Sequence, residues 1–479
     1  MAATYRQSIG GHWVAAANGR TREVIDPSSE SAIAVAPYGD AADCRQAVVA
    51  AAAAFHRWAR ETPYVRGAML RRTSDLIREQ AAALAAITTA ESGKPHAQSA
   101  GEWAVAADLF EWFAEEGKRA YGRTIPSRRA DKRMMVLKQP LGVVGVVTAW
   151  NFPIYNVARA AAAALAAGCT VVLRPSEYTP CTALELARIA EQAGLPPGVL
   201  NVICGEPEPM GQELLDNPLV RKIHLTGSPR VGRRLMAGAA KTIKRLSLEL
   251  GGNAPVLVLP DVDVAAVARS AVAAKFRNCG QVCIAPQRFL VHRTIAEEFA
   301  EQAARQARAI RVGPGADPQS EVGPLINAAQ RDHVASLVEE AVDRGARLLC
   351  GGKRPARPAR GFFYEPTVLA EVVPEHRLFQ EEAFGPVLPV TVFDELDAAI
   401  ELANRTPYGL AAYVWTNDLQ AATRAYERLE FGMVGVNEWA PQATEAPFCG
   451  WKESGIGHES GAEGLDEYLE KKLVSIGGL

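Results

Sequence analysis

The sequence predicts an α/β protein composed of two open parallel-sheet domains. Two observations support this fold class. The chain has 479 residues, which is more than a single hydrophobic core usually organises. Two long stretches also alternate short apolar strands with helices, a pattern typical of βαβ units and parallel sheets. We therefore expect two α/β domains that join near residue 252.

The part of the chain that precedes these stretches is predicted to be helical. An alanine-rich segment of high helix propensity covers 41–54, and helical patterns follow over 69–90 and 102–118. The last pattern carries an aromatic stripe that includes Trp103 and Phe110 and is expected to lie in the core.

The two alternating series begin at Leu141 and at Pro255. In the first, strands are predicted over 143–148, 170–173, 200–203, 222–226 and 245–250, with helices over 158–167, 182–193 and 231–240. In the second, strands are predicted over 255–259, 289–292, 388–393, 411–416 and 433–437, with helices over 264–275, 295–310, 328–344 and 396–404.

Two segments between these elements are predicted to lie at the surface. The stretch 351–361 is rich in Gly, Pro and Arg and is typical of a surface loop. A basic run lies between the helical part and the first series: Arg123, Arg128, Arg129, Lys132 and Arg133. We interpret it as a solvated, exposed ribbon rather than a phosphate-binding patch.

The composition excludes several classes of function. The chain is 48% hydrophobic and 22% charged, as in ordinary globular proteins. Its net charge of -2 gives no electrostatic case for nucleic acid or an anionic membrane, so the expected partner is a small molecule. The segment 1–14 lacks the features of a secretory signal and no long apolar run follows, which favours a cytoplasmic protein. The eight cysteines form no CxxC pair or Cys/His cluster, so neither a disulfide framework nor a metal site is expected.

The pair Cys283 and Glu249 is the main chemical signal. A thiol supplies a nucleophile and a carboxylate supplies a base, which together suffice to form and hydrolyse an acyl intermediate. A lone cysteine is more often a small core residue, so only the joint setting favours catalysis. A free thiol has a pKa of about 8.5, and we expect positive potential or backbone donors beside Cys283. Cys279 is interpreted as a bystander.

Three further groups of polar residues follow predicted strands, where ligands bind in open α/β sheets. Asn151 could hold a developing oxyanion, or could be a turn former before Pro153. The run from Gly227 and Ser228 to Gly232 opens a helix and could receive a phosphate, although it matches neither a P-loop nor the GxGxxG fingerprint. Glu177 could accept hydrogen bonds from ribose hydroxyls, or could cap a surface helix.

Taken in order, these motifs resemble those of the aldehyde dehydrogenase superfamily, nearly end to end. The matching motifs are Trp150-Asn151-Phe152-Pro153, Glu249-Leu250-Gly251-Gly252-Asn253, Gly280-Gln281-Val282-Cys283, Glu381-Glu382-Ala383-Phe384-Gly385-Pro386 and Pro447-Phe448-Cys449-Gly450-Trp451-Lys452. The resemblance implies an aldehyde dehydrogenase-like fold. It assigns 1–118 and 141–252 to a dinucleotide-binding domain, 253–450 to a catalytic domain, and 119–140 with 467–479 to an oligomerisation element of strands. A homodimer or homotetramer follows.

The resemblance also implies the chemistry. Cys283 attacks the aldehyde, Asn151 and the Cys283 N–H hold the oxyanion, hydride passes to nicotinamide, and Glu249 activates water to release the acid. The implied cofactor contacts are Trp150, Arg174, Ser176, Glu177, Gly227, Ser228, Gly232, Glu382 and Phe384.

Within the superfamily the chain is most similar to succinate semialdehyde dehydrogenases. Arg159 and Arg277 fall where those enzymes place a guanidinium pair that grips the distal carboxylate, and guanidinium suits this role chemically. Each arginine could instead serve a structural salt bridge. Gln442 stands where a serine completes that grip, and Phe152 with Phe448 is expected to wall the substrate.

Other positions depart from the family pattern. Ala285 replaces a redox-partner cysteine, Arg174 replaces a lysine before Pro-Ser-Glu, and Ala160 replaces a lysine used as a proton relay. A relay must then run through water, Glu459 or nothing. Glu177 should repel a 2′-phosphate whereas Arg174 could attract one, so NAD is favoured and NADP stays possible.

The sequence therefore predicts NAD(P)-dependent oxidation of a short aldehyde with a distal carboxylate, and the favoured substrate is succinate semialdehyde. The alternatives are glutarate semialdehyde, a hydroxylated semialdehyde, sulfolactaldehyde, or neutral aliphatic and aromatic aldehydes. A Cys hydrolase or acyltransferase without nicotinamide, and a catalytically idle binding protein of the same fold, are the rivals from other classes. No motif places a histidine for the hydrolase, and Cys283, Glu249 and Asn151 are all present, which argues against the idle protein.

Overall fold

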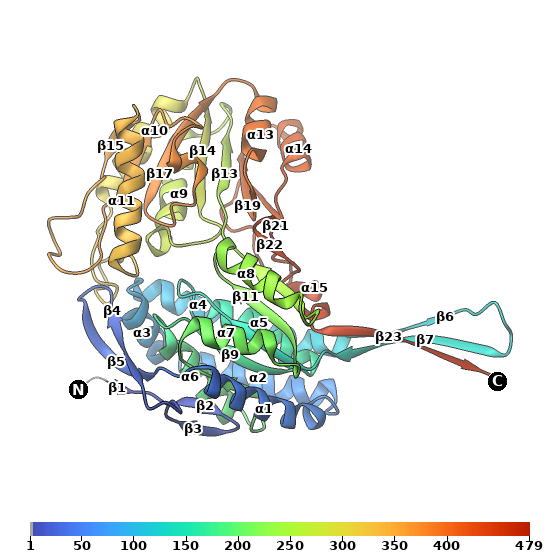
Figure 1. Cartoon of the computed structure of the whole chain (residues 1–479). Helices are drawn as coiled ribbons and strands as arrows, with labels where there is room; N and C mark the ends of the chain where they lie inside the picture. The colour runs from blue at the N-terminus through green and yellow to red at the C-terminus, as the bar shows by residue number, and fades with distance from the viewer. Residues whose placement is uncertain (1–2) are drawn as a thin grey trace.

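Two large sheets, each covered by helices, make up the body of the computed structural model, which describes residues 3–479 (Figure 1). Met1 and Ala2, the start of the segment 1–14, lie outside the described residues. The chain passes from the first sheet to the second between β12 (Arg245–Glu249) and β13 (Ala254–Val258). The predicted junction near residue 252 falls in this connection.

The first sheet has the strand order β22-β12-β11-β8-β9-β10-β2-β3. Its strands are β2 (Gln7–Ile9), β3 (His12–Val14), β8 (Val143–Val147), β9 (Thr170–Arg174), β10 (Leu200–Val202), β11 (Val220–Thr226), β12 and β22 (Gly455–Ile456). The five central strands are parallel, with Val144 opposite Val171 and Ile223 opposite Gly145. Their continuous valine-rich runs are buried on both faces, as parallel strands require.

Helices cover both faces of this sheet. One face packs against α4 (His96–Glu116), α5 (Tyr155–Ala167) and α6 (Pro180–Gln192), and the predicted aromatic stripe of α4 is buried there. The other face packs against α1 (Ala41–Trp58), α7 (Pro207–Asp216) and α8 (Pro229–Ala239). Alanines fill most of α5, which lets this helix approach the sheet closely while Arg159 is carried on it.

The second sheet has the order β15-β16-β17-β14-β13-β19-β20. Its strands are β13, β14 (Pro286–His292), β15 (Arg347–Cys350), β16 (Thr367–Ala370), β17 (Val387–Phe393), β19 (Ala411–Trp415) and β20 (Met433–Val436). The helices α9 (Val264–Phe276), α10 (Ala296–Ala309), α11 (Ala328–Asp343), α13 (Leu396–Asn404) and α14 (Leu419–Arg428) accompany it. A single apolar cluster joins this sheet to α9, α10 and α11.

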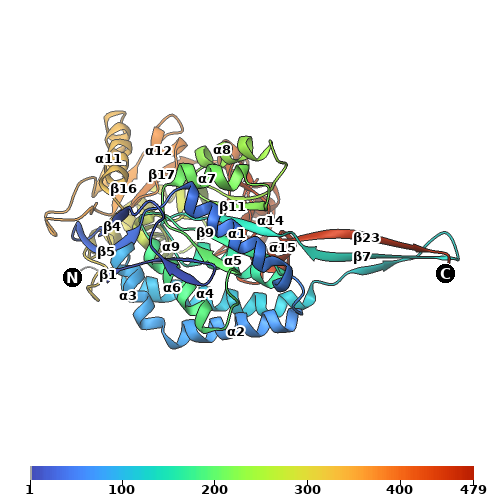
Figure 2. The same cartoon turned by 60° about the horizontal axis from the view of Figure 1, so that its bottom comes forward.

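A three-stranded ribbon projects from the body (Figures 1 and 2). It pairs β6 (Arg123–Ile125) and β7 (Lys132–Pro140) with β23 (Leu469–Gly477), so the C-terminal strand lies along the hairpin. Arg123, Arg128, Arg129 and Arg133 are exposed on this hairpin, which confirms the exposed-ribbon interpretation.

The structure departs from the predicted elements in three places. The single helix predicted over 69–90 is two helices, α2 (Pro63–Glu79) and α3 (Ala81–Ser92), because Gln80 leaves the helical conformation at φ -106° and ψ 8°. Strands β1 (Ala3–Thr4), β4 (Thr21–Asp26) and β5 (Ser31–Pro37) form a small N-terminal sheet that the sequence did not suggest. Both large sheets are mixed at their edges, since β2, β3, β15 and β22 run antiparallel.

The cysteines and the helices bear on disulfide bonding and on membrane crossing. All eight cysteines are free thiols, and five of them are buried. Between residues 3 and 479, no helix combines the length and apolar character that crossing a bilayer requires.

Candidate active site

Four groups of predicted site residues meet at one edge of the first sheet. Asn151 follows β8, Glu177 follows β9, Gly227 follows β11, and Glu249 is the last residue of β12. These strands are parallel neighbours, so their carboxyl ends lie at the same edge. This is the edge at which open α/β sheets bind ligands.

Cys283 lies on a loop whose preceding turn has an unusual backbone. Asn278, Cys279 and Gly280 all have positive φ, at 49°, 56° and 74°. For the two residues with side chains this conformation is strained, and it persists only where the surroundings fix it. Here Asn278 N–H donates to Oε1 of Gln98 at 2.8 Å, and Gln281 Nε2 donates to the Asn278 carbonyl at 3.1 Å.

Close main-chain contacts fix Cys283 relative to Glu249. A Cβ on Gly252, three residues after Glu249, would lie 2.4 Å from the Cys283 carbonyl oxygen. A Cβ on Gly280 would lie 2.1 Å from the Gly385 carbonyl oxygen. Only glycine fits these two positions, and the two loops therefore bring the predicted nucleophile and base together.

A cavity of about 390 Å³ opens beside Cys283. The predicted residues Phe152, Arg159, Arg277, Gln442 and Phe448 line this cavity together with Cys283. The five residues predicted to bind the substrate thus line one cavity with Cys283, whereas Asn151 and Glu249 are not among its lining residues. Its size suits a small ligand.

The electrostatic setting of Cys283 differs from the expectation. Burial raises the pKa of the thiol well above its ordinary value, and the carboxylate of Glu249 raises it further, although Arg159 acts in the opposite direction. The thiol is therefore protonated at rest, and positive potential does not activate it. Buried Glu249 Oε1 has no hydrogen-bond partner within residues 3–479, so it is free to accept a proton. Burial raises the pKa of Glu249 to about 7, which suits a base that works near neutrality.

Asn151 is buried beside the Cys283 loop. Its Nδ2 donates to the carbonyl of Gln281 at 3.1 Å, two residues before Cys283. Its Oδ1 accepts from Nδ2 of Asn156 at 3.3 Å, which orients the amide with its N–H groups toward the loop. The arrangement places an amide donor close to the chain that carries the thiol.

Arg159 is fully buried and ion-paired. Its Nη1 lies 2.6 Å from Oε2 of Glu459, and its guanidinium lies over the rings of Tyr155 and Phe448 at 4.5 and 4.2 Å. Glu459 also contacts Nε2 of His224 at 2.5 Å. The structural salt bridge that the sequence left open is therefore present for Arg159, which also lines the cavity.

Arg277 differs from Arg159 in both respects. It is exposed, and no carboxylate lies within ion-pair distance of it in the part of the chain that is described. Its guanidinium lies 5.6 Å from the ring centroid of Phe152. Arg277 is thus the cavity residue with an unneutralised positive charge, and Gln442 adds a buried Oε1 that lacks a protein partner within residues 3–479.

The predicted pyrophosphate loop has the geometry of an anion site. Ser228 is the N-cap of α8, its Oγ accepting from the Val231 N–H at 3.4 Å, and Gly227 N–H donates to the Glu249 carbonyl at 2.9 Å. Gly232 on the first turn packs against Leu250 and leaves no room for a side chain. An eleven-residue helix with a glycine before its cap fits a phosphate group.

At the end of β9 the two charged residues are paired with each other. Nη2 of Arg174 lies 2.7 Å from Oε2 of Glu177 and 2.8 Å from the Gly205 carbonyl. Arg174 and Ser176 are buried, whereas Glu177 is half-buried. A ribose hydroxyl could reach the remaining carboxylate oxygen of Glu177, and Arg174 is held away from free solvent.

Glu382 and Phe384 contact two other segments that carry predicted site residues. Oε1 of Glu382 accepts from the Gly252 N–H at 3.0 Å, and burial raises the pKa of this carboxyl to about 8. The ring of Phe384 meets the ring of Trp150 edge-on at 5.5 Å.

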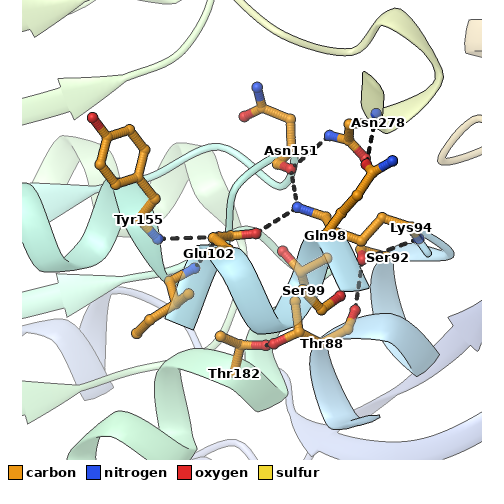
Figure 3. A network of polar contacts seen from close by, with 12 residues as sticks. Thr88, Ser92, Lys94, Gln98, Ser99, Glu102, Asn151, Tyr155, Thr182 and Asn278 are labelled. Atoms are coloured by element: carbon orange, nitrogen blue, oxygen red, sulfur yellow. Dashed lines mark hydrogen bonds and ion pairs between the residues drawn. The ribbon is translucent and has the colours of Figure 1, made fainter. Parts of the chain in front are cut away.

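Several residues at the site were not predicted from the sequence. Tyr155 and Asn156 line the cavity one helical turn before Arg159, so the helical spacing could have indicated them. Glu102 lines the cavity as well, and it contacts Lys94, which in turn contacts Asn151 (Figure 3). His224 was not predicted either, because it lies within an apolar strand and its partner Glu459 is distant in sequence.

Comparisons with known proteins agree with this site. The chain matches the profile of the aldehyde dehydrogenase family over residues 13–474. It is 44% identical to the 3-sulfolactaldehyde dehydrogenase of Pseudomonas putida over 98% of this chain and 96% of that protein. It is 43% identical to the NADP-dependent succinate-semialdehyde dehydrogenase GabD of Escherichia coli over 98% of this chain and 97% of that protein. The crystal structure of a succinate-semialdehyde dehydrogenase from Burkholderia pseudomallei superimposes with a TM-score of 0.97 at 44% identity, over 99% of this chain and 98% of that one.

Proposed function

Because this chain belongs to the aldehyde dehydrogenase family, we propose that it oxidises a short aldehyde with a distal acid group, succinate semialdehyde first. The observation that carries the proposal is the composition of one cavity. Cys283, the candidate nucleophile, shares it with two arginines, of which Arg277 has no carboxylate partner within residues 3–479. A neutral aldehyde would leave this charge unused.

The covalent chemistry is proposed to begin at Cys283. The protonated thiol transfers its proton to Glu249, whose free Oε1 and raised pKa suit that task. The sulfur then bonds the carbonyl carbon, and the oxyanion so formed is held by Nδ2 of Asn151 and the Cys283 N–H. One such donor contributes about 2.7–4 kcal/mol to the stability of the transition state. Glu249 then releases this proton to solvent and, ionised again, takes a proton from the water that attacks the thioester, so that the acid and the Cys283 thiol are released.

NAD or NADP is proposed to lie along the carboxyl edge of the first sheet. Gly227, Ser228 and Gly232 would hold the pyrophosphate, and Glu177 would hold the adenosine ribose. Trp150, Glu382 and Phe384 would border the nicotinamide. The bound nicotinamide supplies the acceptor for the hydride that leaves the thiohemiacetal carbon.

NAD is proposed as the favoured form. Glu177 is half-buried beside the place expected for the ribose, and its negative charge would repel a 2′-phosphate. Arg174 is already engaged by Glu177 and by the Gly205 carbonyl, so its guanidinium is not free to bind a phosphate. The Escherichia coli relative is named for NADP, so NADP is the alternative cofactor.

The proposed substrate class rests on the positive charge in the cavity and not on the chain length of the aldehyde. A cation at the cavity mouth attracts a carboxylate or a sulfonate, and the two relatives are named for succinate semialdehyde and for 3-sulfolactaldehyde. Glutarate semialdehyde and a hydroxylated semialdehyde also carry a carboxylate that this cation would attract. Succinate semialdehyde is proposed first because two of the relatives are succinate-semialdehyde dehydrogenases.

The projecting ribbon is proposed to join subunits in a homo-oligomer. Leu137, Leu473 and Ile476 are 39%, 58% and 40% exposed on it, and an exposed apolar strand pair of this kind favours association. Size-exclusion chromatography with light scattering should then give a dimer or tetramer.

A matched substrate panel tests the proposed function. The purified protein would be assayed by NADH or NADPH absorbance with succinate semialdehyde, glutarate semialdehyde, 3-sulfolactaldehyde and butanal, each with NAD and NADP. We expect the highest kcat/KM for succinate semialdehyde with NAD, and no product from Cys283→Ser, which should still bind NAD. Equal kcat/KM for butanal and the acid-bearing aldehydes would contradict the proposed substrate class.

A further inference from the structure

We propose that Lys94 and Glu102 are positioning residues, which act through the main chain of Asn151 to hold the oxyanion-binding amide in place. This inference rests on the proposed role of Asn151. Glu102 lines the cavity, Lys94 contacts Glu102, and neither residue belongs to the groups predicted from the sequence (Figure 3).

The ion pair is closed to solvent. Nζ of Lys94 lies 2.5 Å from Oε2 of Glu102, and each side chain is 1% exposed. A buried ion pair is rarely a large source of net stability, because desolvation of the two charges offsets their attraction. Net stability alone therefore does not account for this pair.

The ammonium group of Lys94 has a second contact that points to such a role. Nζ donates to the main-chain carbonyl of Asn151 at 2.8 Å, and Nδ2 of Asn278 donates to the same oxygen at 2.9 Å. Two donors from different segments thus fix one carbonyl. Asn278 belongs to the strained turn before Cys283, so this carbonyl couples the Asn151 loop to the nucleophile loop.

Glu102 fixes the other end of the same loop. Its Oε1 accepts from the N–H groups of Ile154 and Tyr155 at 2.9 and 3.1 Å, at the start of α5. Unpaired N–H groups at a helix start need such an acceptor. The loop 151–154 is therefore held at its first residue by Lys94 and at its last by Glu102, and Phe152 between them lies with its ring 4.3 Å from the Lys94 Nζ.

The consequence for catalysis is preorganisation. Rotation of the Asn151 peptide would move Nδ2 away from the developing oxyanion, and a displacement of about 1 Å in a catalytic group can slow a reaction roughly 100-fold. A loop tied at both ends resists that motion. Lys94 and Glu102 do not touch the reacting atoms themselves.

Two variants separate positioning from stability. Lys94→Met leaves the Glu102 charge buried without a partner and should lower the unfolding midpoint. The double variant Lys94→Met/Glu102→Gln removes both charges while the glutamine still accepts from the α5 N–H groups, so its midpoint should return toward the wild-type value. We expect its first-turnover NADH rate to stay roughly 100-fold low. Recovery of the rate together with the midpoint would overturn the proposal.

A double-mutant cycle with Asn151→Ala adds a readout that a structural role does not move. If Lys94 acts through Asn151, the double substitution Lys94→Met/Glu102→Gln should slow the first turnover far less in the Asn151→Ala background than in the wild type. Equal fold losses in both backgrounds would overturn the proposal. Lys118→Met is the matched control, since the ammonium group of Lys118 pairs with Glu115 and lies over the ring of Tyr64, and neither residue lines the cavity; it should leave the rate unchanged.

Acylation of Cys283 by 4-nitrophenyl acetate provides a second assay that requires no nicotinamide. The ester also forms a tetrahedral oxyanion at the sulfur, so the release of nitrophenolate should show the same pattern of losses. A wild-type protein that is acylated but forms no NADH from any aldehyde would refute the proposed function alone. Normal acylation by the charge-removing variant would refute the positioning role alone.

Discussion

Nη1 of Arg159 lies 2.6 Å from Oε2 of Glu459, and the two side chains are 1% and 5% exposed. The arginine lines the substrate cavity, while its charge is neutralised from behind by the glutamate. Glu459 in turn faces His224, whose Nδ1 lies 3.1 Å from the Tyr468 hydroxyl. The guanidinium can still donate hydrogen bonds toward the cavity, but it does not contribute a full free charge there.

Glu459→Gln tests the strength of this buried pair. The variant leaves Arg159 charged and without its partner, so the free energy of unfolding should fall by about 3–5 kcal/mol. Urea unfolding followed by tryptophan fluorescence would measure the change. The double variant Arg159→Met/Glu459→Gln removes both charges and should recover most of the loss.

The same double variant decides whether Arg159 binds substrate. If its guanidinium donates to the distal acid group, the recovered protein should lose roughly tenfold or more in kcat/KM for succinate semialdehyde and little for butanal, since such bonds contribute about 1.5–3 kcal/mol. Parallel losses for the two aldehydes would limit Arg159 to a structural role.

Arg277→Ala tests the unneutralised charge at the cavity mouth. Because Arg277 is exposed, solvent screens its attraction for an acid group, and we expect a loss of about tenfold in kcat/KM for succinate semialdehyde. Butanal should be nearly unaffected. Arg269→Ala, at an exposed position of helix α9, which ends directly before Arg277, is the matched control. If Arg277→Ala has the kcat/KM of the wild type for both aldehydes, Arg277 does not take part in substrate recognition.

The pKa of Glu249 predicts the pH dependence of thioester hydrolysis. Burial raises this pKa to about 7, and a general base acts only in its ionised form. The steady-state rate after the NADH burst should therefore fall as the pH decreases through about 7. Rapid-mixing absorbance at several pH values would measure it.

Glu249→Gln is the control for this assignment. Glutamine does not titrate, so the slow phase should lose its dependence on pH and become much slower, and the NADH burst should form more slowly because Glu249 no longer accepts the Cys283 proton. An unchanged slow phase in this variant would assign the titration to another group.

The ion pair between Arg174 and Glu177 predicts how the cofactor preference can be changed. Glu177→Gln removes the negative charge and frees the guanidinium, which lies 2.7 Å from the carboxylate in this structure. We expect the Kd for NADP to improve about tenfold relative to that for NAD, the range of one added charge-assisted hydrogen bond. Titration of protein fluorescence with each dinucleotide would measure this. Weaker binding of both dinucleotides in equal proportion would indicate that Glu177 only orders the loop.

The alternating apolar segments allowed most of the fold to be predicted. Strands such as β8 and β9 were located because parallel strands buried on both faces read as continuous runs of valine and leucine. The short N-terminal strands escaped prediction, since β4 alternates exposed and half-buried positions and depends on β5 for pairing. The break at Gln80 was also missed, because the residues on both sides of it have high helix propensity.

The sequence by itself determined the fold class and the residue types of the site, because strand periodicity and the motifs around Asn151, Glu249 and Cys283 are local properties. The tertiary structure alone decided the charges that act there. Glu459 neutralises Arg159, Arg277 has no carboxylate partner within residues 3–479, and the Cys283 thiol has a raised pKa. These properties depend on burial and on partners far apart in the chain, such as Lys94 with Asn151, and no local pattern encodes them.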